Sequence, residues 1–592
     1  MSRNATKQDE QLNAAGKIKT LARLFGYLLT YRGLIVGVLA IMAVITAIQI
    51  INPLIIERAI NVHIADKNVD SLICLCVAGL VANIVMILLV KFRMYLMSKM
   101  SNEILVKVRN ELYEHIQKLG FGFFDSRPTG KILSRIMGDV TSLKNVLSES
   151  VTTLIPNAVT IVAVVIIMIV KNPRLALASL WSLPVMAFGV WFLEKKSHAA
   201  WQLFRKKSSN MDAFVHEDIA GIKAVQSFTA EEETSETFGM LVDEHYGSFV
   251  SACRWSDLFG PVIDICWAVG LIAMYYVGIK VVGADNVPIG TLVAYASYVG
   301  MFWQPVMSLS SFYNQLITNI AGAERIFEIL DTAPEITDDE ATLDLPKVRG
   351  EVDFENVSFH YDDDPDVLHG VSFHVEPGQT IALVGPTGAG KSTIINLVSR
   401  FYDVQSGKIL IDGYDVKSVT IESLRKQLGV MTQENFLFTG TIRDNIRYGK
   451  LDATDEEIEA AAKAVNAHEF IMKMEKGYDT EIAERGAGLS AGERQLIAFA
   501  RTMVSDPRIL ILDEATSSID THTEIMVQKG IEVLLEGRTS FIIAHRLSTI
   551  RNADKIMVID DGGIKEAGTA EELMAKKGEY YKLYMAQFEA VS

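Results

Sequence analysis

The chain has 592 residues, of which 49% are hydrophobic and only 22% are charged, and its mean hydropathy is +0.23. A chain of this length is expected to form roughly two to four domains, and its composition is more apolar than a soluble protein requires. The net charge of −16 argues against nucleic-acid binding, because phosphate backbones need clustered Lys and Arg side chains. We therefore expect a membrane-embedded sector and no nucleic-acid partner.

Residues 1–33 are predicted to form a cytoplasmic N-terminus that ends in an interfacial elbow helix. Polar residues of mixed charge come first and no apolar h-region follows them, so a cleavable signal peptide is not expected. From Lys17 to Tyr31, basic and apolar residues alternate as in a helix that lies on the inner membrane surface among lipids.

Residues 34–330 are predicted to form an all-α transmembrane domain of six helices. Each of six apolar stretches is long enough to cross about 30 Å of hydrocarbon, and their number and length exclude the buried helices of a soluble protein. The stretches are Leu34–Ile56, Leu72–Val90, Leu154–Val170, Leu175–Leu193, Val262–Val282 and Ile289–Leu309. The four cysteines lie in or beside apolar stretches without CxxC spacing, so we interpret them as small core or lipid-facing residues.

The loops between these stretches predict the orientation. Connections 91–150 and 194–258 are long and rich in Lys and Arg, whereas the other connections are short and poor in them. Basic loops stay in the cytoplasm, so both termini are expected there. Helical spacing continues through both long connections. Their tips, Phe123–Arg135 and Glu217–Ile222, are either ordinary helical hairpins or docking elements.

Polar and aromatic residues in the spans are candidates for a substrate cavity. Asn83 and Asp264 are costly in a membrane and favour a bundle interior or an aqueous cavity. Asp264 lies near the cytoplasmic end of its span, so an interfacial position and a substrate-facing position are equally consistent with the sequence. Several aromatic residues either line a pocket for flat apolar compounds or serve as belt and packing residues: Trp267, Tyr275, Tyr276, Phe302, Trp303, Phe312 and Tyr313.

Residues 331–350 are predicted to be a linker, because the run is acidic, contains prolines and has no apolar period. From residue 351 to residue 592, short β-rich runs alternate with helical patterns, which predicts an α/β domain with a parallel sheet. Within it, an apolar run leads into a glycine-rich loop and then a helical pattern, which is typical of a P-loop phosphate cradle. The loop consists of Gly385, Pro386, Thr387, Gly388, Ala389, Gly390, Lys391, Ser392 and Thr393.

The P-loop residue types fit a nucleotide triphosphate with Mg²⁺. Lys391 can reach the β and γ phosphates, and the Ser392 hydroxyl can bind Mg²⁺. A later buried strand ends in Asp513 and Glu514, where one carboxylate can hold Mg²⁺ and the next can polarise water. A further strand delivers His545 to the edge of the sheet where ligands bind in open α/β folds.

These motifs, in this order, resemble those of an ATP-binding cassette (ABC) exporter half-transporter of the multidrug type. The resemblance extends from the elbow helix to the C-terminus and implies that residues 351–592 are the nucleotide-binding domain. It implies that Glu514 is the catalytic base, His545 the switch histidine and Ser517–Asp520 the D-loop, and that the two cytoplasmic tips are coupling helices. It also implies roles for Gln433 of the Q-loop, which binds Mg²⁺, for Tyr361, which stacks on adenine, and for Ser490 and Gly492 of the signature segment.

One departure from the family pattern suggests an asymmetric assembly. The usual signature reads Leu-Ser-Gly-Gly-Gln, whereas this chain has Ala491 and Glu493 in the third and fifth places. A Cβ at Ala491 restricts the backbone and Glu493 adds negative charge near an anion, so we expect weaker closure over the partner's ATP. Heterodimeric bacterial exporters pair such a chain with a partner whose catalytic glutamate is replaced. A heterodimer is therefore favoured over a homodimer that tolerates both residues.

The resemblance implies an ATPase that exports amphipathic or hydrophobic drug-like compounds by alternating access. The alternatives are a lipid flippase and a peptide exporter. The N-terminal region is too short for a peptidase domain, which disfavours peptides. The six spans exclude a soluble ABC ATPase, and an ATP-gated channel would show electrogenic flux. The expected location is the plasma membrane of a bacterial cell, with the nucleotide-binding domain in the cytoplasm.

Overall fold

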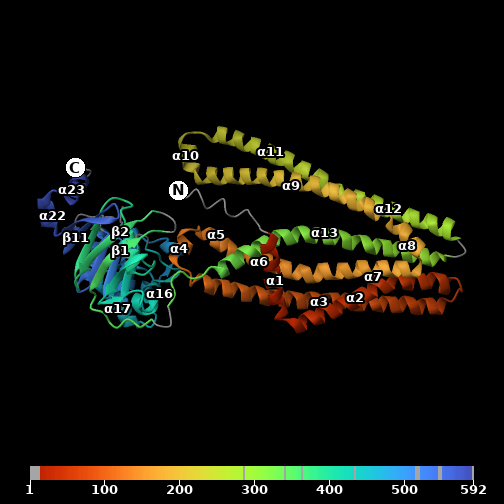
Figure 1. The fold of residues 1–592 in the computed structure, drawn as a ribbon, viewed down its shortest axis with the longest axis horizontal. Coiled ribbons are helices and arrows are strands. Elements are labelled where there is room, and N and C mark those ends of the chain that lie inside the picture. Colours follow the sequence, from red (N-terminus) through yellow and green to blue (C-terminus); the bar gives the residue numbers. More distant parts are fainter. Residues whose placement is uncertain are drawn as a thin grey trace. The chain divides into compact units, whose positions relative to one another are not determined.

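The computed structural model describes residues 14–283, 287–338, 342–361, 365–432, 435–513, 521–543 and 550–589. The chain divides into two compact units (Figure 1). The first unit comprises Met1–Glu114 and Leu133–Asp331, and the second comprises His115–Ile132 and Thr332–Ser592. The second unit therefore includes a short segment taken from the first long connection.

The first unit is built from helices, several of which extend far beyond the length of a membrane span. Its helices are α1 (Ala14–Leu29), α2 (Arg32–Arg58), α3 (Val69–Ile116), α5 (Thr129–Ser134, shared with the second unit), α6 (Val140–Glu149), α7 (Ile155–Lys171), α8 (Pro173–Leu180), α9 (Leu183–Ala220), α10 (Ile222–Ser227), α11 (Glu231–Asp257), α12 (Phe259–Tyr276) and α13 (Ile289–Asp331). Asn172 accepts hydrogen bonds from the backbone N–H groups of Arg174 and Leu175, so it ends α7 and caps α8.

Among the described residues, five helical segments are long and apolar enough to cross a membrane. They are Arg32–Ile64, Val69–Ile116, Thr129–Lys171, Pro173–Ala220 and Glu231–Gly283, and they contain the first five predicted stretches. The sixth predicted stretch lies in α13, where the apolar helical run Ile289–Phe302 is shorter.

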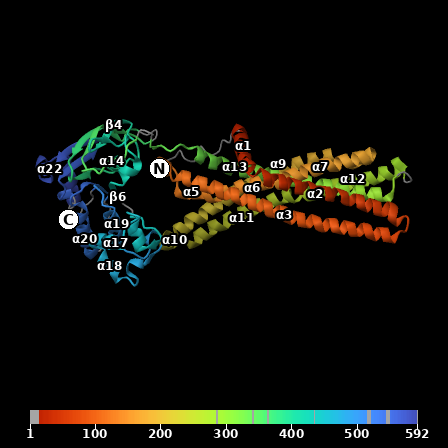
Figure 2. The same ribbon diagram turned by 90° about the horizontal axis from the view of Figure 1, so that it is seen from below.

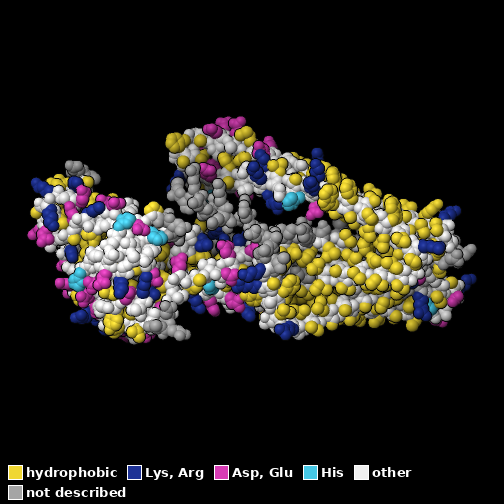
Figure 3. All heavy atoms as spheres, viewed as in Figure 1, with side chains coloured by type: hydrophobic (Ala, Val, Ile, Leu, Met, Phe, Trp, Pro, Cys, Tyr) yellow, Lys and Arg dark blue, Asp and Glu magenta, His cyan; other side chains and the backbone are white. Residues whose placement is uncertain are grey.

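Hydrophobic side chains cover one half of the helical unit on its outside (Figure 3). In α3, none of the most apolar window is buried, and Ile87 and Leu88 are 62% and 60% exposed. An apolar surface of this size is unfavourable in water and favourable against lipid tails. The exposed band therefore supports the assignment of these helices to a membrane.

Hydrogen bonds pair several polar groups inside the helical unit. The side chains of Asn52 in α2 and Asn83 in α3 donate to each other, with N–O distances of 3.1 and 3.3 Å. The buried Tyr298 donates its hydroxyl to the Ile50 carbonyl oxygen at 3.0 Å, and Tyr295 bonds the Met168 carbonyl oxygen in the same way. These bonds join α13 to α2 and α7, where apolar media make unpaired groups costly.

The second unit contains two larger sheets and a group of helices. Its elements are α4 (Phe121–Asp125), β1 (Val352–Phe359), β2 (Leu368–Val375), β3 (Thr380–Val384), α14 (Lys391–Val398), β4 (Ser406–Ile411), β5 (Tyr414–Asp415), α15 (Ile421–Arg425), β6 (Leu428–Met431), β7 (Gly440–Thr441), α16 (Ile442–Arg447), α17 (Asp455–Ala464), α18 (His468–Lys473), β8 (Glu481–Ile482), α19 (Ala491–Val504), β9 (Ile509–Asp513), α20 (Thr521–Leu535), β10 (Thr539–Ile543), β11 (Lys555–Asp560), β12 (Gly563–Gly568), α22 (Ala570–Lys576) and α23 (Glu579–Glu589).

The larger sheet has the strand order β12-β11-β3-β10-β9-β6, and its strands from β11 to β6 are parallel. The antiparallel sheet has the order β2-β1-β4-β5. Helices α17, α18 and α19 gather at the end of this unit opposite β4 (Figure 2). Strands β3, β9 and β10 are buried along almost their whole length, as expected for parallel strands covered on both faces.

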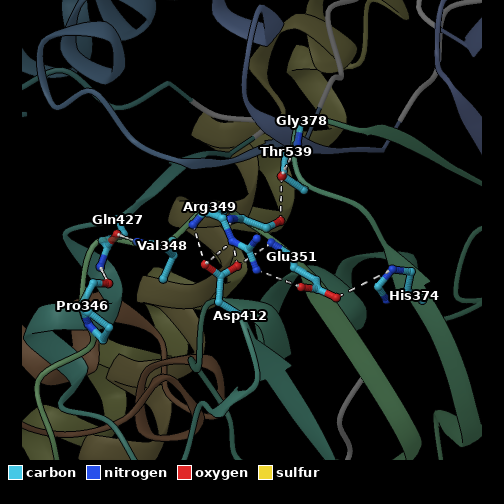
Figure 4. Close-up of polar contacts among 10 residues, drawn as sticks. Pro346, Val348, Arg349, Glu351, His374, Gly378, Asp412, Gln427 and Thr539 are labelled. Carbon is cyan, nitrogen blue, oxygen red and sulfur yellow. Dashed lines mark hydrogen bonds and ion pairs between the residues drawn. The ribbon is translucent and has the colours of Figure 1, made fainter.

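The segment before β1 is fastened to the second unit by a carboxylate (Figure 4). Asp412 accepts hydrogen bonds from the backbone N–H groups of Arg349, Gly350 and Glu351 at 2.5, 3.0 and 2.8 Å. Thr539, at the start of β10, donates its hydroxyl to the Gly350 carbonyl oxygen at 2.7 Å. Three backbone donors on one carboxylate hold the chain firmly where it enters the sheet.

Candidate nucleotide-binding site

The predicted site residues follow strands that end at one edge of the larger sheet. Ile543 of β10 pairs with Leu383 of β3 and with Asp513 of β9, and Met431 of β6 pairs with Leu512 of β9. Because parallel strands run in the same direction, their carboxyl ends share this edge, where ligands of open α/β sheets bind. Three predicted residues lie outside the described residues, as does the D-loop Ser517–Asp520: Gln433, Glu514 and His545.

The P-loop runs from the end of β3 into α14, and two of its positions accept only glycine. A Cβ at Gly385 would lie 2.0 Å from the Ile559 carbonyl oxygen in the neighbouring β11. At Gly390, where φ is +104°, a Cβ would lie 2.8 Å from Leu368 Cδ2. The loop therefore passes close to its neighbours while Pro386, Thr387 and Gly388 stay exposed on the outer side. This is the shape that lets backbone N–H groups face phosphate oxygens.

The Lys391 side chain folds back over the loop that precedes it. Its Nζ donates hydrogen bonds to the carbonyl oxygens of Gly385 and Pro386, both at 2.8 Å, and only 9% of the residue is exposed. Burial lowers the pKa of Lys391, and the nearby Asp513 carboxylate opposes that shift. The ammonium group is thus held at the loop by weak carbonyl partners that phosphate oxygens can replace.

The residues predicted to bind Mg²⁺ offer the donors that this ion prefers. Ser392 is exposed at the second position of α14, and Asp513 is half-buried at the end of β9. A hydroxyl and a carboxylate are hard oxygen ligands, which suit Mg²⁺ bound together with nucleotide phosphates. The described part of the site therefore fits the ion.

Tyr361, the predicted adenine-stacking residue, is anchored beside the same helix. Its hydroxyl oxygen lies 3.2 Å from the Thr393 hydroxyl oxygen in α14, and Asn396 Nδ2 donates to it at 3.5 Å. The ring stands edge-on to Phe359, with centroids 4.8 Å apart, and is half-buried. These contacts place a flat aromatic surface next to the P-loop.

The signature segment forms the N-terminus of α19. Ser490 is its N-cap residue, and Glu493 completes a capping box with it. Ala491 is exposed as the first helical residue, a conformation that a Cβ permits, while Gly492 is buried. The backbone restriction expected from Ala491 therefore does not weaken this segment, and Glu493 is the departure from the usual signature that matters here. The sequence Ser-x-x-Glu before an apolar run is a known capping signal, so the sequence alone could have revealed this role.

The sequence left open whether the first cytoplasmic tip is an ordinary helical hairpin or a docking element. In the structure, α4 of this tip packs against other residues of the second unit. The ring of Phe121 in α4 packs against Phe401, with centroids 4.4 Å apart. Glu335 lies against the start of α4, where a Cβ at Gly122 would come 2.7 Å from its Oε1 atom. Sequence reasoning missed Phe401 and Glu335, because they contact a segment more than 200 residues away. At the second tip, which belongs to the first unit, Phe228 after α10 is 85% exposed.

The candidate substrate residues are spread over several environments. Asp264 is exposed on α12, as are Trp267 and Tyr276. Phe302 and Phe312 are buried in α13, and Tyr275 packs against the apolar core of the helical unit. The side chains of Trp303 and Tyr313 lie outside the described residues.

Comparisons with known proteins match both halves of the chain. Residues 34–306 match the ABC transporter transmembrane region, and residues 368–517 match the ABC transporter domain. An uncharacterized ABC transporter ATP-binding protein, YknV of Bacillus subtilis, is 41% identical over 96% of this chain and 94% of its own length. An ATP-dependent lipid A-core flippase of Syntrophus aciditrophicus is 37% identical over 90% of this chain and 89% of its own length. The solved structure of a bacterial Atm1-family ABC exporter with ATP bound has a TM-score of 0.77 and 29% identity, covering 94% of this chain and 98% of that one.

Proposed function

The chain belongs to the ABC transporter family as an exporter half-transporter that joins a helical transmembrane domain to a transport-coupled ATPase domain, and we propose that it is the catalytically complete subunit of a heterodimeric exporter of amphipathic compounds. ABC half-transporters work as dimers. The observation that carries the heterodimer is the glutamate in the signature segment. Glu493 places a negative charge beside the N-terminus that must close over the partner's ATP.

In the proposed cycle, the residues of this chain hold and position the nucleotide. Lys391 exchanges its two carbonyl partners for phosphate oxygens, and Tyr361 stacks on the adenine. Mg²⁺ bound by Ser392, Gln433 and Asp513 would neutralise charge on the phosphates. Glu514 polarises the attacking water and His545 contacts the γ-phosphate. Closure of two nucleotide-binding domains then moves the membrane helices from an inward-facing to an outward-facing state.

The proposed location is the bacterial plasma membrane, with both termini and the nucleotide-binding domain in the cytoplasm. The long basic connections support this orientation through the positive-inside rule. We assign residues 1–33 to the N-terminus and elbow helix, 34–330 to the transmembrane domain, 331–350 to the linker and 351–592 to the nucleotide-binding domain. Residues 115–132, which include most of the first tip, fold in the same unit as that last domain.

Two measurements test the subunit assignment. Native mass measurement of the complex purified from its own host should give the mass of two different half-transporters, and a mass of twice this chain would refute the heterodimer. Glu514→Gln should remove nearly all ATP turnover of the assembly, because the other site lacks its own catalytic base. Glu532→Gln, an exposed carboxylate of α20 in the same domain, is the matched control and should leave turnover unchanged.

Amphipathic drug-like compounds are the proposed substrates, with Asp264 as a counter-charge for cations. Asp264→Asn should reduce transport of cationic compounds more than that of neutral ones of similar shape. Asp257→Asn, at the exposed end of α11, is the control. An equal effect of Asp264→Asn on both classes would remove this carboxylate from the substrate path.

Lipid flipping is the second candidate function. It is favoured by the similarity to a protein named as a lipid A-core flippase. Reconstituted vesicles containing a fluorescent lipid in one leaflet would show ATP-dependent translocation under this alternative. Drug transport without lipid translocation would exclude it.

A further inference from the structure

Tyr402 contacts both the docked coupling tip and the proposed adenine-stacking residue. Its hydroxyl donates a hydrogen bond to the carboxylate of Asp125, the last residue of α4. Its ring stands edge-on to Tyr361, with centroids 5.1 Å apart and an interplanar angle of 89°. The preceding residue, Phe401, packs against Phe121 of α4. One short segment after α14 therefore contacts α4 through Phe401 and Tyr402, and it contacts Tyr361 through Tyr402.

The contacts continue from Tyr361 to the P-loop helix. The Tyr361 hydroxyl lies 3.2 Å from Thr393 Oγ1, and Thr393 is buried at the third position of α14. Edge-to-face aromatic pairs have preferred geometries, so a base that stacks on Tyr361 also restricts the ring of Tyr402. A restricted Tyr402 ring in turn fixes where its hydroxyl can meet Asp125.

The surroundings of Tyr402 keep its hydroxyl protonated. Burial and the hydrogen bond to Asp125 raise the pKa of Tyr402, and Tyr361 and Glu335 raise it further. The hydroxyl is therefore a proton donor throughout the physiological pH range. Its hydrogen bond to a carboxylate is charge-assisted and stronger than a bond between neutral groups.

We propose that Tyr402 is a positioning residue that couples adenine binding at Tyr361 to the seating of the coupling tip α4. Binding of the adenine ring favours the geometry in which the Tyr402 hydroxyl holds Asp125, and a seated α4 favours adenine binding in return, as linkage requires. The coupling depends on the adenine role of Tyr361 and on ATP binding by this chain. It does not depend on the substrate or on whether the partner is a second copy.

The nucleotide base can be separated from the phosphates in the test. Amide hydrogen exchange is measured on the full transporter in lipid nanodiscs, with no nucleotide, with Mg²⁺ and AMP-PNP, or with Mg²⁺ and inorganic tripolyphosphate. Both ligands should slow exchange in residues 385–393, which reports occupancy of the P-loop. Only AMP-PNP should slow exchange in α4. Equal protection of α4 by tripolyphosphate would overturn the role of adenine.

Four variants then test the hydroxyl itself. Tyr402→Phe keeps the ring and should reduce the AMP-PNP effect on α4 at least fivefold, as should Asp125→Leu. Asp125→Asn should preserve most of the effect, because its amide oxygen still accepts the bond. Tyr478→Phe, which removes a hydroxyl bonded to His468 at 2.8 Å elsewhere in the domain, is the matched control.

Two further results would overturn the proposal. The first is full AMP-PNP protection of α4 in Tyr402→Phe. The second is loss of protection at residues 385–393 in Tyr402→Phe even at saturating AMP-PNP, because Tyr402 would then shape the nucleotide site itself. A purely structural role would slow or speed exchange in α4 equally with and without nucleotide.

Discussion

Glu493 folds back onto Ser490 at the start of α19: its Oε2 accepts a hydrogen bond from the Ser490 backbone N–H at 2.8 Å, and Ser490 Oγ accepts one from the Glu493 N–H at 3.2 Å. The side chain thus stabilises the helix while it places a charge where the family has a neutral glutamine. Two of the N–H groups at this helix terminus bond within the chain itself. Both features reduce what the segment can offer to a phosphate.

Replacing Glu493 with glutamine should strengthen closure on ATP. Glutamine also completes a capping box, so only the charge is removed. One charge at partly solvated distances is worth about 1 kcal/mol, so the KM for ATP of the assembled complex should fall about fivefold. ATPase measurements over a range of ATP concentrations check this.

A comparison of Glu493→Gln with a second variant, Glu493→Ala, separates the effect of the charge from the effect of the capping bond. Glu493→Ala removes the charge and also the side-chain bond to the Ser490 N–H, while Ser490 still caps the helix through the backbone N–H of residue 493. If charge governs closure, both variants lower the KM for ATP. A lower KM in neither variant would show that Glu493 does not weaken the signature segment.

Two glycines in the second unit should respond differently to alanine. Gly385→Ala should abolish nucleotide binding, because its Cβ would lie 2.0 Å from a backbone oxygen in β11. Gly378 also has a positive φ, +81°, but no heavy atom lies within 4 Å of its added Cβ. Gly378→Ala should therefore cost only about 1–2 kcal/mol of backbone strain and keep nucleotide binding. Binding of a fluorescent ATP analogue to both variants decides the matter, and equal loss in both would contradict the steric argument.

The P-loop was predictable from the sequence because the residues that bind phosphate are consecutive in the chain. The five apolar helical segments were predictable for a similar reason, since each contains a long, continuous run of apolar residues. The partners of Asn83 and α4 were not predictable. Asn52 lies 31 residues from Asn83, and Tyr402 lies 277 residues from Asp125. Periodicity identifies an exposed or a buried face, whereas a specific contact depends on how whole elements pack.

The pKa of His374 should lie above the ordinary value for histidine. Its Nδ1 lies 2.6 Å from the Asp353 Oδ1 atom across the pair β1 and β2, and this hydrogen bond is the main cause that raises its pKa. The unfolded value is about 6.5. The contribution of this hydrogen bond to the free energy of unfolding is therefore complete below pH 6.5 and is lost as the pH rises through the raised pKa of His374. It should be small, because both groups are partly exposed and screened.

Carbethoxylation of His374, followed by mass spectrometry as a function of pH, measures this pKa directly, since only neutral imidazole reacts. Its midpoint should lie above 6.5 in the wild-type chain and fall in Asp353→Asn. A midpoint that Asp353→Asn leaves unchanged would exclude Asp353 as the cause.

Glu57 joins three helices at the ends that are predicted to face outward. Its carboxylate accepts a hydrogen bond from Lys171 at the end of α7, and another from Thr291 Oγ1 in α13 at 2.8 Å. Asn61 adds a bond to the Gly290 backbone N–H at 2.8 Å. An outward-facing state requires spans to separate at this end, so we expect these polar contacts to oppose it.

Glu57→Gln should shift the transporter toward outward opening without nucleotide. The variant removes the ion pair but keeps an oxygen that can accept from Thr291, so it tests the charge. Spin labels at Asp66 and Arg174, in a background without native cysteines, would report the change by pulsed electron–electron distance measurement. The longer-distance population should grow, and ATP should add less to it than in the wild type, because a state already populated is shifted less. Lys67→Gln, which removes an exposed charge at the same end, should leave the distances unchanged. This variant changes the net charge in the opposite direction to Glu57→Gln, so responses of similar size and opposite direction would show that net charge at this end, and not the ion pair, sets the balance.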